Sequence, residues 1–247
     1  MSYAIRTITT NTNEWGFIQT FINSILAADT NITLVTDIDE LEASYSDNSA
    51  KPAFVFNVGG MYTITFTRYS PISNSTDEYV VTSTAAPGVL TDLYFRDNAQ
   101  SASATAIRSF RYMVAGNSGC INVRVAGYNH SDVQGSPQIS FLAFRANAYS
   151  GRGCSFGNTN IINTIFYMTD GDSTPVTKAD RLPYAYDESN ENNVEIIKNK
   201  VFMKYSSTNR FVTVTGLYDA STVTKDTLRV IDGKRYYSLD EHTIMEV

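Results

Sequence analysis

Histidine often carries acid–base chemistry near neutral pH, and this chain has two histidines, His130 and His242. A catalytic histidine needs a nucleophile and an orienting carboxylate that the fold brings within hydrogen-bond reach. Neither histidine has a recognisable neighbouring motif, and no Gly-x-Ser-x-Gly elbow occurs. We therefore expect both to be structural or surface residues, and we expect the protein not to be an enzyme.

The cysteines and aspartates form no complete metal-binding motif. Cys120, Cys154 and the two histidines lack the spacing of a zinc site. Asp170-Gly-Asp172 resembles the start of a calcium loop, but the later acidic ligands and the terminal glutamate are missing. The glycine-rich stretch 151–157 lacks the Lys-Ser/Thr ending of a phosphate loop. The sequence predicts no metal site and no cofactor.

Acidic residues cluster at 37–42, where a predicted strand over 32–38 meets a short predicted helix over 39–43. Acids are favoured in the first turn of a helix, and we interpret the cluster in that way. The paired carboxylates of a glycosidase are assembled in three dimensions, so one sequence does not reveal them. A cell-wall-degrading enzyme therefore stays as the least favoured hypothesis. The four residues are Asp37, Asp39, Glu40 and Glu42.

Tyrosines near predicted strand ends suggest two uses. Tyr128 and Tyr149 could face a sugar ligand, together with Tyr94 and Tyr184. The favoured interpretation is that such tyrosines lie at sheet edges or interfaces, where the ring packs and the hydroxyl stays hydrated. Trp15 is assigned to a helix core instead.

Composition narrows the class of partner. The net charge of −6 argues against nucleic-acid binding, which needs a basic surface. No run approaches the ~18 apolar residues of a membrane span, so we expect no membrane insertion. Met1 to Thr10 lacks the pattern of a secretory signal, and we expect Cys120 and Cys154 to be free thiols in a reducing cytoplasm, although a disulfide between them stays open.

Hydrophobic periodicity predicts a mainly β protein with one N-terminal amphipathic helix. Apolar residues recur at helical spacing over 12–28, where Thr12 or Asn13 can cap the start. Alternating residues predict a hairpin around Gly59-Gly60 and a longer hairpin around 116–119, with Asn122 and Arg124 facing outward. About ten strands with turns every 8–12 residues favour an antiparallel β-sandwich or a barrel-like core.

The C-terminal residues 228–247 predict three short strands that end at Val247. Asp232-Gly233 between apolar runs is a strong hairpin signal. We predict an N-terminal helix and β body over 1–187 and a smaller C-terminal β unit over 188–247, while a single domain remains the alternative. Candidate assembly contacts are Tyr236, Tyr237, Leu239, Ile244 and Val247.

Three segments make the chain similar to a virion protein of tailed bacteriophages. One is the opening Ser2-Tyr-Ala-Ile-Arg6 with the following threonines and the Trp15 helix. Another is Asn163-Thr-Ile-Phe-Tyr-Met-Thr-Asp-Gly171 followed by Arg181-Leu-Pro-Tyr184. The third is Val230-Ile-Asp-Gly-Lys-Arg-Tyr-Tyr-Ser-Leu239 with the terminal strand. They cover about a third of the chain and resemble small tail, baseplate or other surface components.

The resemblance implies a structural role with no catalytic residues. We expect a tail- or baseplate-associated subunit, made in the host bacterial cytoplasm, that contacts copies of itself and other virion proteins. The alternative is a host-binding module that recognises cell-wall carbohydrate through the loops 129–137 and 147–160.

Overall fold

The computed structural model describes residues 1–46, 50–68, 76–84, 89–96, 105–128, 138–145, 152–157, 165–169, 177–181, 199–205, 211–220, 223–224, 227–239 and 243–247. These residues form two helices and seventeen strands. The helices are α1 (Glu14–Ala28) and α2 (Ile38–Tyr45). The first strands are β1 (Ser2–Thr12), β2 (Ile32–Leu34), β3 (Ala53–Val58), β4 (Tyr62–Arg68), β5 (Thr76–Ser83), β6 (Val89–Arg96), β7 (Ala106–Gly116), β8 (Cys120–Tyr128) and β9 (Gln138–Arg145). The others are β10 (Arg152–Gly157), β11 (Ile165–Thr169), β12 (Thr177–Arg181), β13 (Asn199–Tyr205), β14 (Phe211–Asp219), β15 (Leu228–Ile231), β16 (Lys234–Ser238) and β17 (Thr243–Glu246).

Helix α1 forms where the apolar spacing predicted it. Its N-cap is Asn13, whose side-chain oxygen accepts a hydrogen bond from the Gly16 backbone N–H at 2.9 Å. One face is buried and consists of aromatic and β-branched residues, which fixes how the helix packs. These residues are Phe17, Ile18, Phe21, Ile22 and Ile25.

The larger of the two described sheets has twelve antiparallel strands. Its order is β1-β7-β8-β9-β10-β11-β12-β13-β14-β17-β16-β15, and it does not close into a barrel. The predicted mainly β class is therefore confirmed, with the sandwich form rather than the barrel. Strand β1 was not predicted, and it pairs with β7 along its whole length, from Ser2 opposite Gly116 to Thr12 opposite Ala106.

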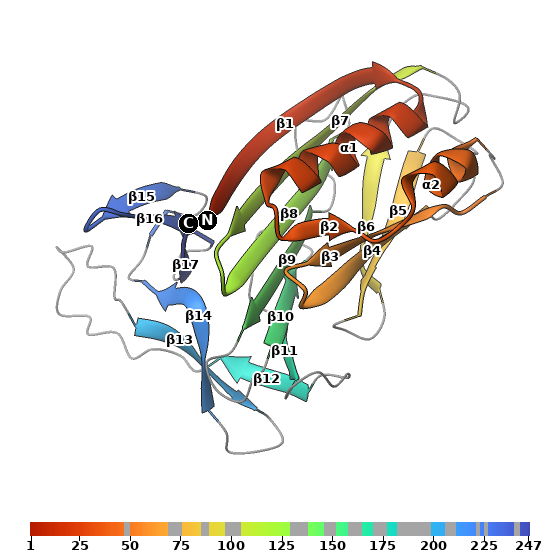
Figure 1. Ribbon diagram of the computed structural model, residues 1–247. Coiled ribbons are helices and arrows are strands. Elements are labelled where there is room, and N and C mark those ends of the chain that lie inside the picture. The colour runs from red at the N-terminus through yellow and green to blue at the C-terminus, as the bar shows by residue number, and fades with distance from the viewer. Residues whose placement is uncertain are drawn as a thin grey trace.

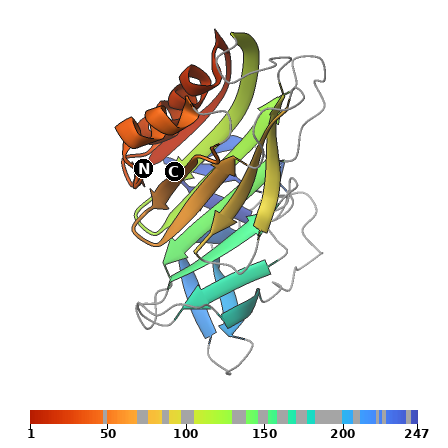
Figure 2. The same cartoon turned by 90° about the vertical axis from the view of Figure 1, so that its right-hand side faces the viewer.

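A five-stranded sheet, in the order β2-β3-β4-β5-β6, and α1 together cover one face of β7, β8 and β9 (Figures 1 and 2). The residues between these layers form the first core cluster. In β8 it contains Ile121, Val123 and Val125, and in β9 it contains Ile139 and Phe141. The two-residue period of the strands places these side chains on one face.

The C-terminal strands of the large sheet fold back over the other face of β7–β9. Met113, Cys120, Leu142 and Phe144 pack there against residues of β14, β16 and β17, and this group is the second core cluster. β7–β9 are therefore covered on both sides. The expectation that Asn122 and Arg124 face outward is wrong, because both are buried under the C-terminal strands.

Tight turns follow the sequence signals. The Asp232-Gly233 loop has φ of 49° and 76°, the left-handed pair that a two-residue hairpin needs. Gly59 and Gly60 also have positive φ, at 62° and 64°, between β3 and β4.

Polar segments of the sheet were harder to predict than apolar ones. β10 lies in the expected loop 147–160, and β12 lies in a stretch where no strand was predicted. The predicted strand 32–38 is shorter, because β2 ends at Leu34 and Asp37 caps α2. The predicted boundary near 187 falls outside the described residues, and β12 and β13 on either side of it pair directly.

The two termini lie side by side (Figure 1). Near the N-terminus, the Tyr3 ring packs against the Tyr237 ring with 5.2 Å between centroids. At the C-terminus, the Val247 N–H donates to the Arg235 carbonyl at 2.9 Å. Both ends are thus tied to β16.

Candidate functional site

The predicted assembly residues lie inside the chain's own fold. Tyr237, Leu239 and Val247 belong to the second core cluster, while Tyr236 and Ile244 pack with Ala220 and Val223 in a third cluster. All five side chains are at most 6% exposed. Their contact with a neighbouring subunit stays a prediction. In this structure they stabilise the C-terminal strands of the twelve-stranded sheet.

Strand β15 is the outer edge of the twelve-stranded sheet and carries exposed apolar side chains. Leu228 is 39% exposed and Val230 is 69% exposed. Arg235 lies directly opposite Val230 on β16, so the three side chains share one face of the hairpin. This face is called the β15 edge surface.

The pairing of β15 with β16 gives the direction of its backbone groups. The Ser238 N–H donates to the Thr227 carbonyl at 2.9 Å, and hydrogen-bonded positions alternate along an antiparallel pair. Arg229 and Ile231 therefore direct their backbone groups toward β16, and Leu228 and Val230 direct theirs away from the sheet. An edge with outward N–H and C=O groups is a template for contact with another chain.

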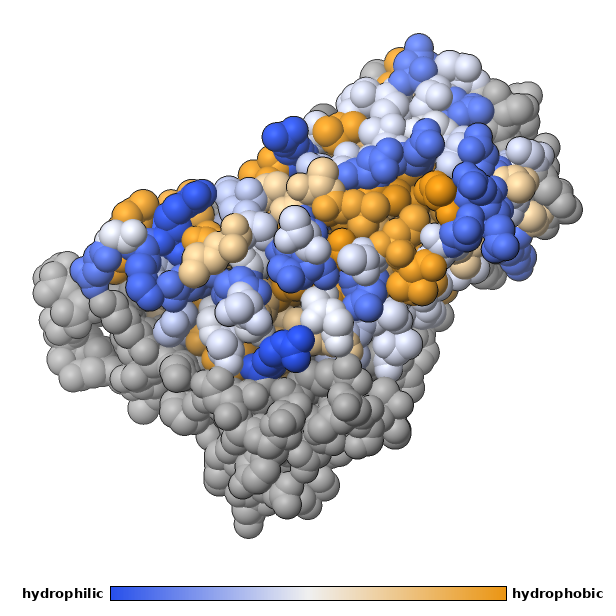
Figure 3. Space-filling model, viewed as in Figure 1, coloured by the Kyte–Doolittle hydropathy of each residue, from blue (hydrophilic) through white to orange (hydrophobic). Residues whose placement is uncertain are grey.

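A second apolar surface lies where β2 meets α2. Val35 is 60% exposed and Ile38 is 37% exposed, and Figure 3 shows hydrophobic surface over this region. Exposed carboxylates of α2, including Asp39 and Glu42, border it. No lysine or arginine occurs between Arg6 and Lys51, so this surface has acidic character. It is called the β2–α2 surface.

A buried ion pair joins the start of α1 to the five-stranded sheet. The Glu14 carboxylate accepts a hydrogen bond from Arg68 at 2.7 Å, and both side chains are at most 1% exposed. The Tyr79 hydroxyl donates to Glu14 at 3.0 Å and lies 2.8 Å from the Tyr45 hydroxyl. The Arg68 guanidinium lies over the Tyr45 ring. Because its members come from α1, α2, β4 and β5 and bond to one another in the core, this network links these four elements.

Asn117 connects the β7–β8 turn to the C-terminal strands. Its side-chain oxygen accepts hydrogen bonds from the Gly119 and Cys120 N–H groups at 2.8 and 2.9 Å. Its side-chain nitrogen donates to the Glu246 carbonyl at 2.8 Å. Gly216 lies so close that an added Cβ would be 2.4 Å from the Asn117 nitrogen.

Three ionisable residues on β14, β16 and β17 form a cluster. Lys234 and Glu246 pair at 2.9 Å, and the Tyr218 hydroxyl donates to Glu246 at 3.2 Å. Partial burial, followed by the Glu246 charge, raises the pKa of Tyr218. The hydrogen bond to Glu246 raises the pKa of Lys234. The cluster keeps both protons bound and therefore does not resemble a general base.

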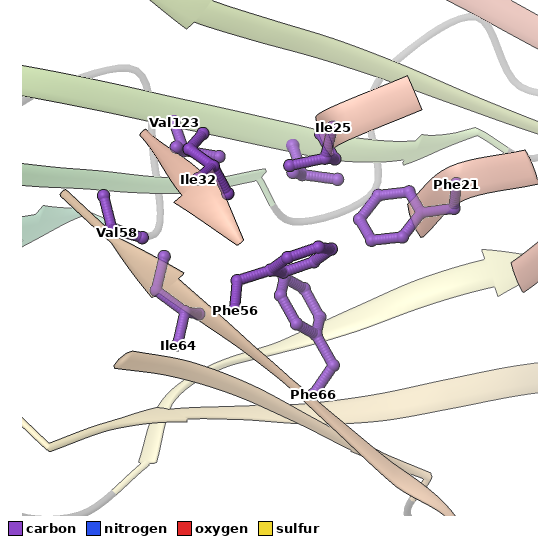
Figure 4. A pocket seen from close by; sticks show the side chains of 9 residues that line it. Phe21, Ile25, Ile32, Phe56, Val58, Ile64, Phe66 and Val123 are labelled. Carbon is purple, nitrogen blue, oxygen red and sulfur yellow. The ribbon is translucent and has the colours of Figure 1, made fainter. Parts of the chain in front are cut away.

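The cavity in Figure 4 lies inside the first core cluster. Its volume is about 10 Å³, and it is lined by apolar side chains from α1, β2–β4 and β8. This volume is at the lower limit for one water molecule, and the lining offers water no polar partner. The cavity is a packing gap rather than a ligand site. Its lining residues are Phe21, Ile25, Ile32, Phe56, Val58, Ile64, Phe66, Val123 and Val125.

Most of the histidine, cysteine and tyrosine candidates from the sequence have side chains outside the described part of the structure. His130, His242 and Tyr149 lie outside the described residues, and the side chains of Tyr128 and Cys154 do too. Carbohydrate binding by the two tyrosines thus stays a prediction. Cys120 makes no disulfide and is fully buried, and burial strongly raises the pKa of its thiol. Within the described ranges, no group of three or more His, Cys, Asp or Glu side chains could hold a metal ion.

The described residues thus define a mainly β, two-sheet protein with an exposed sheet edge. Comparison with protein-family models, with curated proteins and with solved structures finds no match for this chain. No helix in the described part of the chain is long and apolar enough to cross a membrane.

Sequence reasoning missed the β15 edge surface and the β2–α2 surface. The strand at Leu228–Ile231 was predicted, but its place at the sheet edge depends on the pairing of all twelve strands. The signal available in the sequence was the pair of cations Arg229 and Arg235 beside apolar residues, because charged residues commonly protect edge strands.

Proposed function

We propose that this protein is a structural subunit of a larger particle and acts through subunit–subunit contacts. The observation that carries the proposal is β15, an edge strand whose backbone groups point away from the sheet and whose Leu228 and Val230 side chains are exposed. Such an edge leaves hydrogen-bonding groups and apolar area that a neighbouring protein can cover.

The proposed particle is the virion of a tailed bacteriophage, with the subunit in the tail or baseplate. This part rests on the resemblance of the three sequence segments to virion proteins. A low fraction of charged residues, 18%, suits a chain that is largely covered in an assembly. The proposed partners are copies of the chain and other virion proteins, and no catalytic step is involved.

Locating the chain in purified particles tests this proposal. Phage particles are purified on a density gradient from bacteria infected with the phage that encodes this chain. The proteins of the particles are then quantified by mass spectrometry. We expect a fixed number of copies per particle, and antibody labelling in electron microscopy should mark the tail. A chain found only in the soluble fraction of the lysate would contradict the proposal.

Deletion of Leu239–Val247 tests whether the C-terminal strands are needed for folding and assembly. β17 lies between β14 and β16, and its Met245 and Val247 fill the second core cluster. We expect the truncated chain to be unfolded by circular dichroism and absent from particles. A truncated chain that folds and enters particles would show that these strands are dispensable for assembly.

A further inference from the structure

The β15 edge surface and the β2–α2 surface are bordered by charges of opposite sign. The β15 edge surface combines Leu228 and Val230 with Arg235, and Arg229 lies on the same strand. The β2–α2 surface combines Val35 and Ile38 with exposed carboxylates of α2. Each surface therefore has an apolar centre and a charged border, the arrangement of a protein interface.

The position of each charge relative to the apolar centre follows from the local geometry. Arg235 is directly opposite Val230 in the β15–β16 hairpin. Glu42 is four residues after Ile38 in α2, so these two side chains are neighbours on the helix surface, whereas Glu40 lies on another flank. Arg235 is thus a direct neighbour of Val230, and Glu42 is a direct neighbour of Ile38.

The two surfaces lie at opposite ends of the described molecule (Figure 1), with β15 at one end and α2 at the other. Surfaces at opposite ends cannot pair within one chain, but they can pair between copies. Contact of different surfaces on identical subunits is head-to-tail, and it produces rings or filaments.

We propose that the β15 edge surface of one copy docks on the β2–α2 surface of the next copy. Leu228 and Val230 contact Val35 and Ile38, and Arg235 faces Glu42. The inference rests on the proposed structural role and names the partner of that edge as a second copy of this chain. The apolar area is small, so a single contact is weak, and closure into a ring strengthens it through multivalency.

Sedimentation velocity of the purified full chain tests the contact over a wide concentration range at low and high salt. We expect reversible association beyond the dimer, which weakens as salt screens the charges. Arg235→Glu alone and Glu42→Lys alone should each weaken association by about tenfold or more. An equimolar mixture of the two variants should regain association, because each new charge then meets its opposite.

Matched controls separate the contact from general charge effects. Glu40→Lys changes the same helix by the same charge on another flank, and Arg111→Glu changes an exposed residue of β7. Both should associate like the parent chain, and all variants should have the circular dichroism spectrum and melting temperature of the parent.

Three results would overturn the inference. One is a parent chain that stays monomeric at every concentration and salt. Another is an association that stops at the dimer and ignores Glu42→Lys, which would indicate pairing of two β15 edges. The third is a mixture of the variants that does not regain association. A chain that fails these tests but is found in particles would leave the proposed function intact, with other virion proteins as its partners.

Discussion

At the scale of single residues, the effect of losing an ion pair on stability depends on whether the pair is buried. Glu14 and Arg68 are both removed from water, and the loss of one partner leaves the other buried without its ion pair. Lys234 and Glu246 form an ion pair of nearly equal length, but Lys234 is 59% exposed, so water replaces a lost partner. Loss of an ion pair should therefore lower stability strongly at Glu14–Arg68 and only slightly at Lys234–Glu246.

Replacement of Arg68 by alanine should be strongly destabilising. We expect the free energy of unfolding to fall by about 3–5 kcal/mol, because the Glu14 carboxylate stays buried without its cation. Lys234→Ala is the control and should change stability little. Urea denaturation followed by circular dichroism measures both, and an equal effect of the two variants would contradict the structural role of the buried pair.

Tyr218 should make stability depend on alkaline pH. The raised pKa of this residue means that the folded chain holds the phenol proton more tightly than the unfolded chain. Its contribution is fully present below the unfolded pKa of about 10 and is lost as pH rises through the higher folded pKa. The stability difference between the parent and Tyr218→Phe should therefore be constant to about pH 9 and shrink above about pH 10. Urea titrations across this range measure it, and a constant difference would contradict the coupling.

At the scale of elements, strands with alternating apolar residues were predictable and others were not. β3 and β4 show a strict alternation around two glycines, and both formed as expected. β1 is rich in threonine and β12 has the sequence TKADR, so neither shows the pattern of a half-buried strand. Their conformation comes from pairing with neighbours that are distant in sequence, which overrides local propensity.

The exposed surfaces were unpredictable for a related reason. Tyr236 and Tyr237 look like surface aromatics in the sequence, but strands on both sides and a covering layer bury them. Val230 looks like a core residue and is 69% exposed, because nothing pairs with the outer side of β15 in the described sheet. Burial of a strand residue depends on the strand order of the sheet, and one sequence does not contain that order explicitly.

A side chain at Gly216 should destabilise the protein. Its φ of 77° is unfavourable for other residues by roughly 1–2 kcal/mol, and a Cβ would overlap the Asn117 side chain. We expect Gly216→Ala to cost about 1–3 kcal/mol more than Gly60→Ala, which has a similar φ but open space around it. Equal melting temperatures of the two variants would contradict the close contact between β14 and the β7–β8 turn.

At the scale of the whole molecule, β7–β9 connect two cores. Their side chains alternate between the first core cluster under α1 and the second core cluster under the C-terminal strands. Asn117 adds a hydrogen bond from the β7–β8 turn to Glu246 of β17, 129 residues away in sequence. Loss of either core removes one of the two layers that cover these strands, so the cores should unfold together.

Trp15 and Cys120 can serve as separate probes of unfolding in the two cores. Trp15, the only tryptophan, packs against the first core cluster, and Cys120 lies in the second. In a Cys154→Ser variant, Cys120 is the only thiol. We expect the urea midpoints from tryptophan fluorescence and from thiol labelling to coincide. Earlier labelling of Cys120 would indicate that the C-terminal unit opens independently, in agreement with a separate domain after residue 187.

The adjacent termini have a consequence for engineering the chain. A short flexible linker from Val247 to Met1 would join them without crossing either sheet (Figure 1). New ends could then be opened at the exposed Gly60, whose surroundings are empty within 4 Å of an added Cβ. Such a circular permutant keeps every strand beside its present neighbours, and surface loops of this kind usually accept new ends. It would move both ends of the polypeptide away from β15 and so free that end of the molecule from any attached tag.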